Sequence, residues 1–280
     1  TLDRTRKIRI FIPDKYHQSV IGSMIDGYYT SDRESISLYD SARHLLESEL
    51  GLDKLTFQKP PGYTAQLSEI ELSRRFDSEC FYPAFNHFQK NLPSGVDLTR
   101  FFTHLSFCQR GKQPIYKAQG LPVINSKHVQ ANRVLIEGNR NAIKNPVSEL
   151  NIRYGDILLN GTGRGTLGRA APYLEESIAV PDNHVTILRT PNLDPVYVSL
   201  YLNSLAGQMQ VEMHQRGTSG QLELYPFDIR KFLIWEAPES LQKELRSLYD
   251  RAAAAERKSK ELLEAAKTRV EQLIEEAAQA

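Results

Sequence analysis

The stretch QSVIGSMIDGYYTSDRESISLYDSA at residues 18–42 returns as QKELRSLYDRAAAAERKSKELLEAA at residues 242–266. Every matched residue is displaced by 224 positions, so that Ser35 corresponds to Ser259. A repeat whose two copies enclose a complete globular region predicts a pseudo-symmetric molecule built around two equivalent helices. Such an architecture suits a protein that holds two sites at a fixed distance better than one that contains a single active site.

Both copies carry the spacing of a long helix with one packed face. Apolar and small residues recur alternately every three and four positions, which predicts helices within residues 14–54 and 237–280. Gly51 is placed to end the first helix. The middle of each seam carries Ala and Ser, which let two helix axes approach closely. Two unrelated surface helices are the alternative, and they leave the shared register unexplained.

A short strand is predicted before each helix. The match is Ile8-Arg9-Ile10-Phe11 against Ile229-Arg230-Lys231-Phe232, after a three-residue slip. Residues 1–13 alternate apolar and polar positions and are interpreted as the closing strand of a preceding domain. Residues 55–236 are predicted to form one domain of mixed α and β structure. Its expected strands are 122–125, 133–136, 156–159, 184–188 and 229–234, and its expected helices are 82–92 and 194–213.

Composition narrows the class of protein. The chain has 280 residues, of which 40% are hydrophobic, enough for one substantial core. No stretch resembles a signal peptide, and the apolar runs are too short to span a bilayer. Cys80 and Cys108 form no CxxC or Cys/His cluster, so neither a disulfide framework nor a zinc site is expected. We expect a cytoplasmic location.

Positive charge is concentrated in one segment of a chain whose net charge is only +1. Residues 104–169 contain ten Lys and Arg against three Asp and Glu, a net charge of +7, which leaves −6 for the remainder. A basic segment in a nearly neutral protein favours a DNA-binding face, and an ordinary solvated surface is the alternative.

The sharpest local motif is the glycine-rich segment 155–169, which contains Gly163-x-Gly165-x-x-Gly168 after a predicted strand. The spacing matches a dinucleotide-binding loop, but Pro172 arrives where a helix would have to begin, and no acidic residue follows a second strand. The absence of a following Lys-Ser/Thr pair excludes a P-loop. A glycine-rich hairpin is predicted instead, whose Arg and Thr side chains reach phosphates or base edges. A tight turn without a ligand is the alternative.

A second polar loop, residues 214–221, follows the predicted helix 194–213. Arg216 and Gln221 are residue types that make bidentate contacts to guanine and adenine, and the glycines give the loop reach. A simple connection between a helix and a strand is the alternative.

No catalytic set is evident in the sequence. Asn145-Pro146-Val147-Ser148 resembles the motif that holds a flipped adenine in methyltransferases but lacks the aromatic residue that stacks on the base. Asp182-Asn183-His184 suggests metal or acid–base chemistry, although His184 in a predicted strand favours a structural role. We therefore predict no catalytic residues, no metal and no cofactor.

Fragments of the central domain resemble the specificity (S) subunit of type I restriction–modification systems over nearly the whole chain. They occur in the order of that family: Arg75-Phe76-Asp77-Ser78-Glu79-Cys80-Phe81-Tyr82-Pro83, Gly120-Leu121-Pro122-Val123-Ile124, Gly155-Asp156-Ile157-Leu158, Gly168-Arg169-Ala170-Ala171 and Asp182-Asn183-His184-Val185.

This resemblance implies a fold and a function. The fold is an α/β (α+β) target recognition domain with a small curved sheet, plus two long helices that form an antiparallel coiled-coil spacer. The function is a non-catalytic DNA-recognition subunit that reads half of a bipartite target. Its implied partners are double-stranded DNA, adenine-methyltransferase subunits and, in some assemblies, the restriction/translocase subunit. An adenine-specific DNA methyltransferase and a coiled-coil scaffold that does not bind DNA are the alternatives.

The chain departs from the family pattern in one respect. Family members have two complete recognition domains, whereas only one is expected here, at 55–236, between spacer helices at 14–54 and 237–280. Two interpretations are open: the chain is a fragment, or it is a natural half-length subunit. A half-length subunit would restore the symmetry as a homodimer through the spacer helices.

Two groups of side chains are expected to contact DNA. The candidates for reading bases lie in the two polar loops: Thr162, Arg164, Thr166, Arg169, Arg216, Thr218 and Gln221. The candidates for phosphate contacts lie in the basic segment: Lys112, Lys117, Lys127, Arg133 and Arg140.

Overall fold

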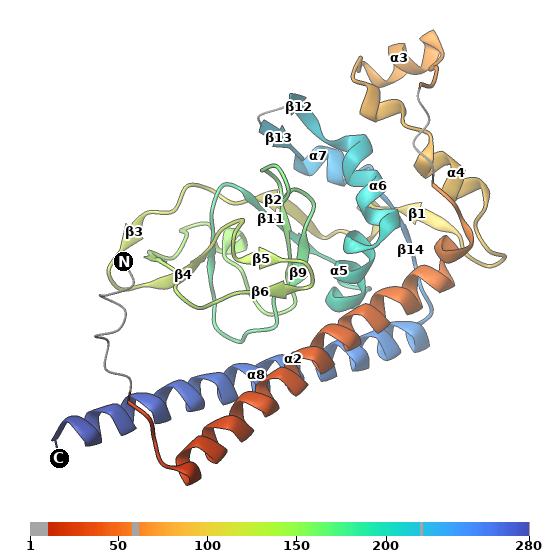
Figure 1. Cartoon of the computed structure of the whole chain (residues 1–280). Helices are drawn as coiled ribbons and strands as arrows, with labels where there is room; N and C mark the ends of the chain where they lie inside the picture. The colour runs from red at the N-terminus through yellow and green to blue at the C-terminus, as the bar shows by residue number, and fades with distance from the viewer. Residues whose placement is uncertain (1–10, 58–61, 219–220, 280) are drawn as a thin grey trace, which may run out of the picture. The chain divides into compact units, whose positions relative to one another are not determined.

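The computed structural model describes residues 11–57, 62–218 and 221–279 (Figure 1). They divide into two compact units, one made of Thr1–Ser41 with Ser247–Ala280 and the other of Ala42–Arg246. The helices α2 (Lys15–Glu49) and α8 (Glu239–Gln279) each run from one unit into the other. Most of the strand predicted at 1–13 lies outside the described residues, and residues 11–13 belong to no helix or strand.

The first unit is a pair of antiparallel helices. The Tyr39 and Tyr249 rings lie 5.6 Å apart, Arg269 lies 2.7 Å from the His17 ring nitrogen, and Gly27 lies close to Leu262. Residue numbers therefore rise along α2 as they fall along α8. This confirms the antiparallel arrangement.

Small side chains fill the interface between these two helices. Ser35 is 3% exposed and Ser259 is 2% exposed, and Ser31, Ala252 and Ala255 are buried with them. The two serines are equivalent in the sequence repeat, so the shared register reflects a shared role in packing. Small residues allow close approach of the axes but bury little apolar area.

Both copies of the repeat also begin with the same hydrogen bond. The Gln18 side-chain amide donates to the Pro13 carbonyl at 2.7 Å, and that of Gln242 donates to the Ala237 carbonyl at 2.8 Å. Each glutamine thus satisfies a carbonyl five residues earlier, just before its helix begins. The displacement of 224 positions therefore holds for the helix starts as well as for the seams.

The strand predicted at 229–234 is wrong in its first half. Pro226–Ile229 forms the short helix α7, and the strand β14 is Leu233–Trp235, antiparallel to β1 (Leu98–Arg100). Proline favours the first turn of a helix, which explains the helical start. With the strand moved, the 224-residue displacement matches Lys7-Ile8-Arg9-Ile10-Phe11 to Lys231-Phe232-Leu233-Ile234-Trp235, so no slip is needed.

The core of the second unit is a four-stranded antiparallel sheet in the order β2–β11–β8–β9. Its strands are β2 (Phe107–Arg110), β11 (Val185–Arg189), β8 (Ile157–Asn160) and β9 (Ala170–Pro172). Every residue of β8, β9 and β11 is buried, with Leu158, Ile187 and Tyr173 in one hydrophobic cluster. Strands covered on both faces explain why these segments lack clean alternation.

A second four-stranded sheet has the order β10–β4–β7–β3, with β10 and β4 parallel. Its strands are β10 (Val180–Pro181), β4 (Leu121–Ile124), β7 (Asn141–Ala142) and β3 (Tyr116–Lys117). Two hairpins complete the β structure, β5 (Val129–Gln130) with β6 (Arg133–Val134) and β12 (Arg216–Thr218) with β13 (Gln221–Glu223). The α/β class is confirmed, but the described strands form several small sheets in place of one.

The helix predicted at 194–213 is wrong as a single element. It is two helices, α5 (Pro195–Asn203) and α6 (Leu205–His214), which meet at Ser204. Ser204 has an extended backbone, and its hydroxyl caps α6 by accepting the Gly207 N–H. A serine that caps a helix offers the backbone an alternative to helix continuation, and this breaks the pattern. Helix α5 packs on β8 and β9.

The remaining elements are short. The helix predicted at 82–92 is confirmed as α4 (Ala84–Lys90), and Gly51, at φ 70°, lies just beyond the end of α2 as predicted. The others are α3 (Leu67–Ser73) and the 3₁₀ helices η1 (Leu52–Lys54), η2 (Ser78–Phe81), η3 (Phe101–His104) and η4 (Ser148–Leu150). Within the described residues, no helix is long and apolar enough to cross a membrane.

Candidate nucleic-acid interface

The glycine-rich segment forms the turn that joins β8 to β9. Gly163, Gly165 and Gly168 have φ angles of 103°, 79° and 78°, which L side chains rarely adopt. The chain enters β9 directly after the turn, and no helix begins there. The predicted hairpin is therefore confirmed, and Arg164 lies exposed between the first two glycines.

The two polar loops predicted from separate parts of the sequence lie side by side. The Gly163 N–H donates to the Leu222 carbonyl at 3.2 Å, and the Leu224 N–H donates to the Gly161 carbonyl at 2.9 Å. Thr162 and Glu223 form an antiparallel bridge between them. The β12–β13 hairpin is thus an extension of the glycine-rich turn, and we call the two together the reading loops (residues 160–169, 216–218 and 221–223), after the base contacts predicted for them from the sequence.

Arg110 holds the reading loops together, although from the sequence it was only one of the ten basic residues in the segment 104–169. Arg110, at the end of β2, donates to the Glu223 carboxylate at 2.6 Å and to the carbonyls of Gly161 and Leu224 at 3.0 and 2.9 Å. Its guanidinium also lies over the Tyr225 ring, 5.0 Å from the centroid. A β carbon at Gly161 would lie 2.8 Å from this guanidinium, so a larger residue there would displace the Arg110 side chain from its present position.

The predicted residues of the glycine-rich turn take different roles. The Thr162 hydroxyl is buried and lies 2.7 Å from the His184 ring nitrogen Nδ1, while the Thr166 hydroxyl donates to the Thr162 carbonyl at 3.1 Å. Arg169 donates to the side-chain oxygen of Gln130 at 3.0 Å. The exposed Arg164 is the member of this group best placed for a ligand.

The predicted residues of the β12–β13 hairpin also have local partners. Arg216 makes two hydrogen bonds to the buried Asp228 carboxylate, at 2.7 and 2.9 Å, and lies over the Phe227 ring. Gln221 is exposed and donates to Glu223 at 3.3 Å. Thr218 pairs with Gln221 in the strand ladder. The Asp228 contact orients Arg216 and uses two of its donor groups.

The five predicted phosphate-contacting residues are exposed but do not form one patch. Lys127 lies beside the reading loops, because the Asn160 side chain donates to the carbonyls of Ser126 and Val129, both at 3.0 Å. Lys112 follows β2, and Arg133 lies in β6. The other two, Lys117 and Arg140, lie at the β3 edge of the second sheet.

Asp182 and His184 have structural contacts. The Asp182 carboxylate is buried, and burial raises its pKa, opposed by a hydrogen bond from the His184 backbone N–H at 2.8 Å. Because the carboxylate accepts from the backbone and not from the imidazole, the pair does not form a proton relay. No cluster of three metal-ligating side chains occurs in the described ranges 11–57, 62–218 and 221–279.

Asn145 likewise has a local role. Its side-chain oxygen accepts the Val147 N–H at 3.0 Å, and its own N–H donates to the Asn151 side chain at 2.9 Å. The residue resembling a methyltransferase motif therefore shapes a turn.

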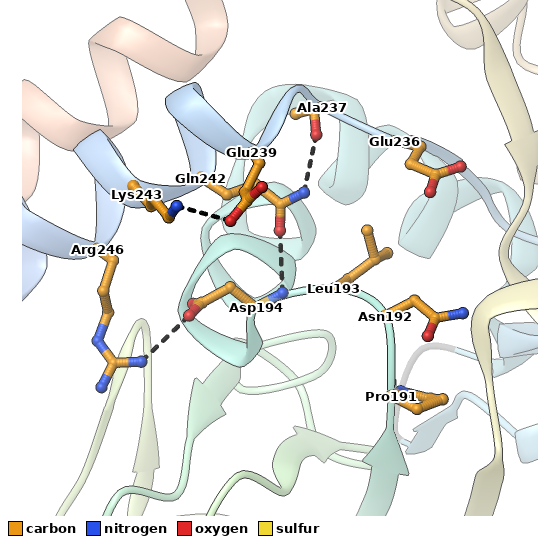
Figure 2. A pocket seen from close by; sticks show the side chains of 10 residues that line it. All are labelled: Pro191, Asn192, Leu193, Asp194, Glu236, Ala237, Glu239, Gln242, Lys243 and Arg246. Atoms are coloured by element: carbon orange, nitrogen blue, oxygen red, sulfur yellow. Dashed lines mark hydrogen bonds and ion pairs between the residues drawn. The ribbon is translucent and has the colours of Figure 1, made fainter.

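A polar pocket lies beside the first turns of α8 (Figure 2). Gln242 accepts the Asp194 N–H at 3.0 Å, and Arg246 donates to the Asp194 carboxylate at 3.1 Å. The same carboxylate caps α5 by accepting from Val196 and Tyr197. Asp194 thus connects the first turns of α8 to α5. The polar residues of this pocket hold two helices together, and we do not assign them a ligand.

Comparison with known proteins gives structural neighbours only. No family model matches the chain, and no curated protein matches it. One similar solved chain comes from work on complex assembly and conformational transition of the type I restriction–modification (R-M) system, with 14% identity, coverage of 94% of this chain and 60% of that one, and a TM-score of 0.45. Another is the S subunit of a type I system from M. genitalium, with 12% identity, coverage of 93% and 61%, and a TM-score of 0.47.

Both neighbours come from type I restriction–modification systems, the family that the sequence resembles. This chain spans about 60% of the length of each of them.

Proposed function

We propose that this chain is a DNA sequence-recognition subunit of a type I restriction–modification complex. The observation that carries the proposal is the joining of the two polar loops, which come from distant parts of the sequence and meet with Arg164 exposed between two glycines. The glycine-rich loop belongs to the segment where positive charge is concentrated. Arginine beside glycine suits contacts to base edges, and the exposed lysines suit contacts to phosphates.

In this proposal the two long helices measure the distance between half-sites. Helix α8 has 41 residues, and at 1.5 Å per residue it extends about 60 Å. Its first turns belong to the second unit, which in this proposal is the recognition unit, and are tied there to α5 through Asp194. The helices would position adenine-methyltransferase subunits, and a restriction/translocase subunit where one joins. The chain itself acts without catalysis.

We further propose that a second recognition domain docks at the start of α2, supplied by a second copy of this chain. Gln18 repeats the Gln242 hydrogen bond, but only Gln242 also accepts from Asp194. Beside Gln18, the apolar residues Ile12 and Tyr16 are 75% and 72% exposed. A homodimer related by the repeat would cover both and would read a palindromic split target.

Selection of bound duplexes from a random DNA pool tests the proposal, with this chain supplied together with its methyltransferase subunits. Enrichment of a palindromic split sequence supports both the recognition function and the homodimer. Enrichment of one unsplit half-site supports recognition and rejects the homodimer. No enriched sequence would overturn the proposal in favour of a protein scaffold, and methyl transfer by the purified chain alone would overturn it in favour of an enzyme.

A further inference from the structure

A basic pocket lies at the β3 edge of the second sheet, away from the reading loops. It is lined by Tyr116, Lys117, Ala118, Asn139, Arg140 and Asn141, has a volume of about 460 Å³ and is largely open to solvent. Figure 1 shows β3 far to one side of the β12–β13 hairpin within the recognition unit. The lining contains two cations and no carboxylate.

The two cations are held without a neutralising partner. The Arg140 guanidinium lies over the Tyr116 ring, 3.6 Å from its centroid, which fixes the plane of the charged group. Lys117 sits beside that ring in β3 and is exposed. Of the residues that the structure describes, none forms an ion pair with Lys117 or Arg140. Two like charges in the lining of one pocket favour an anion there.

Hydrogen bonds from side chains to the backbone hold two of the lining residues in place. Asn139 donates to the Val123 carbonyl at 3.0 Å, and Asn141 donates to the Ala118 carbonyl at 3.4 Å. Gly120 passes so close to β7 that a side chain there would lie 2.2 Å from the Ala142 carbonyl oxygen. A preorganised site loses less conformational entropy when it binds.

Sheet order separates this pocket from the reading loops. The strand β10 leads into Asp182 and His184, of which His184 contacts Thr162, while β3 lies at the opposite edge of the same sheet. Three strand spacings amount to roughly 14 Å. The pocket and the reading loops are therefore separate places on the second unit, and a duplex that lay across both would meet them at different backbone positions.

We propose that this pocket binds a single backbone phosphate of the DNA, outside the bases that the reading loops contact. Lys117 supplies a point charge and Arg140 a planar pair of donors to the phosphate oxygens. The inference rests on the proposed DNA-recognition function. It adds that Lys117 and Arg140 share one phosphate, whereas Lys127 serves another.

Duplexes that each carry one uncharged methylphosphonate test the pairing of pocket and phosphate. The full chain with its methyltransferase subunits is titrated with each duplex, as wild type and as the Lys117→Ala, Arg140→Ala and Lys90→Ala variants. Lys90 is exposed on α4 and serves as the matched control. We expect one methylphosphonate position that weakens wild type and Lys90→Ala by about tenfold but no longer weakens the two pocket variants. We also expect the salt dependence of log K to fall by about 0.9 in each pocket variant.

The outcomes separate this inference from the recognition function. Sequence-selective binding with additive losses at every position would overturn the pocket and leave recognition intact. Failure of wild type to bind any duplex would overturn both. Inorganic phosphate that binds wild type but not Lys117→Ala, and that leaves the DNA affinity of wild type unchanged at matched ionic strength, would assign the pocket to the free anion and overturn the DNA contact.

Discussion

The Arg110 guanidinium donates to the Glu223 carboxylate at 2.6 Å and thereby ties β2 to β13, two strands that belong to different sheets. The two side chains are 20% and 16% exposed, so water screens their attraction only in part. Because the same guanidinium holds the carbonyls of Gly161 and Leu224, one residue below the surface sets the spacing of both reading loops.

Arg110→Ala should therefore lower both stability and DNA affinity. Removal of one partner of a largely buried ion pair costs about 3 kcal/mol, since it leaves the Glu223 carboxylate without its cation. We expect that loss in the free energy of unfolding, measured with urea. Arg164→Ala is the matched control, because its side chain is exposed and its loss should change stability by less than about 0.5 kcal/mol. Equal stability of the two variants would contradict the bracing role.

Arg164 and Lys127 should differ in how their loss affects DNA binding. Arg164→Ala is expected to relax sequence preference by about 1–3 kcal/mol at one base pair, since a base-edge contact is sequence-dependent. Lys127→Ala is expected to weaken all duplexes alike and to lower the salt slope by about 1. Titrations against matched and mismatched duplexes at several salt concentrations measure both effects. A uniform loss for Arg164→Ala would rule it out as a base reader.

Two glycines of the glycine-rich turn should tolerate alanine differently. Gly165 has φ 79° and open space around it, so Gly165→Ala should cost only backbone strain, about 1–2 kcal/mol. Gly168 has φ 78°, and a side chain there would lie 2.7 Å from both γ carbons of the buried Val211. We expect Gly168→Ala to cost a further 1–3 kcal/mol, approximately, from overpacking.

A double-mutant cycle separates the two causes at Gly168. Val211→Ala in the Gly168→Ala background removes the overlapping carbons and should restore part of the lost stability, measured as a positive coupling in urea unfolding. The same Val211→Ala change in the Gly165→Ala background should show no coupling. Additive losses in both backgrounds would mean that the strain of the turn, and not the contact with Val211, decides the cost.

The helices were predictable because their signal is repeated in the sequence. The three-four spacing predicted α2 and α8, and the shared register of Ser35 and Ser259 indicated one packing role, which the burial of both confirms. Boundaries of helices and strands that depend on a single residue were not predictable. Ser204 splits the helix at 194–213 by accepting one N–H, and Pro226 turns the start of the strand at 229–234 into helix.

The candidate site was predictable in its parts but not in its assembly. The glycine spacing indicated the turn, and the mixture of Arg, Gln and Gly indicated the hairpin, yet no local pattern shows that Gly163 bonds to Leu222. Arg110 lies in an ordinary strand with no motif around it, because its role depends on three partners distant in sequence. Such long-range contacts leave no periodicity to read.

Helix α2 contains two glycines whose replacement should have different effects on stability. Alanine is favoured over glycine within a helix by about 0.5–1 kcal/mol. A β carbon at Gly22 would have no neighbouring atom within 4 Å, so Gly22→Ala should raise the free energy of unfolding by about that amount. At Gly27 the β carbon would lie 3.0 Å from Leu262 Cδ1, and the gain should be smaller or lost. Thermal unfolding compares the two, and an equal gain would mean that Leu262 moves aside freely.

His214 should make the stability of the second unit depend on pH. Its ring stacks on Phe232, and burial lowers its pKa from 6.5 to about 4, with Lys231, Arg75 and Arg216 adding to the effect and Asp228 opposing it. Between these two pKa values the unfolded chain binds a proton that the folded chain does not. The contribution of His214 is therefore complete above pH 6.5 and is lost as the pH falls toward 4.

Each pH unit within that window should remove about 1.4 kcal/mol per proton from the free energy of unfolding. Urea unfolding at a series of pH values measures the slope for the wild type and for His214→Phe, which keeps an aromatic ring against Phe232 but cannot bind a proton. The slope between pH 4 and 6.5 should be shallower in the variant by nearly one proton. An unchanged slope would mean that the ring is protonated in the folded chain, in which case an NMR titration of His214 would show a midpoint near that of free histidine.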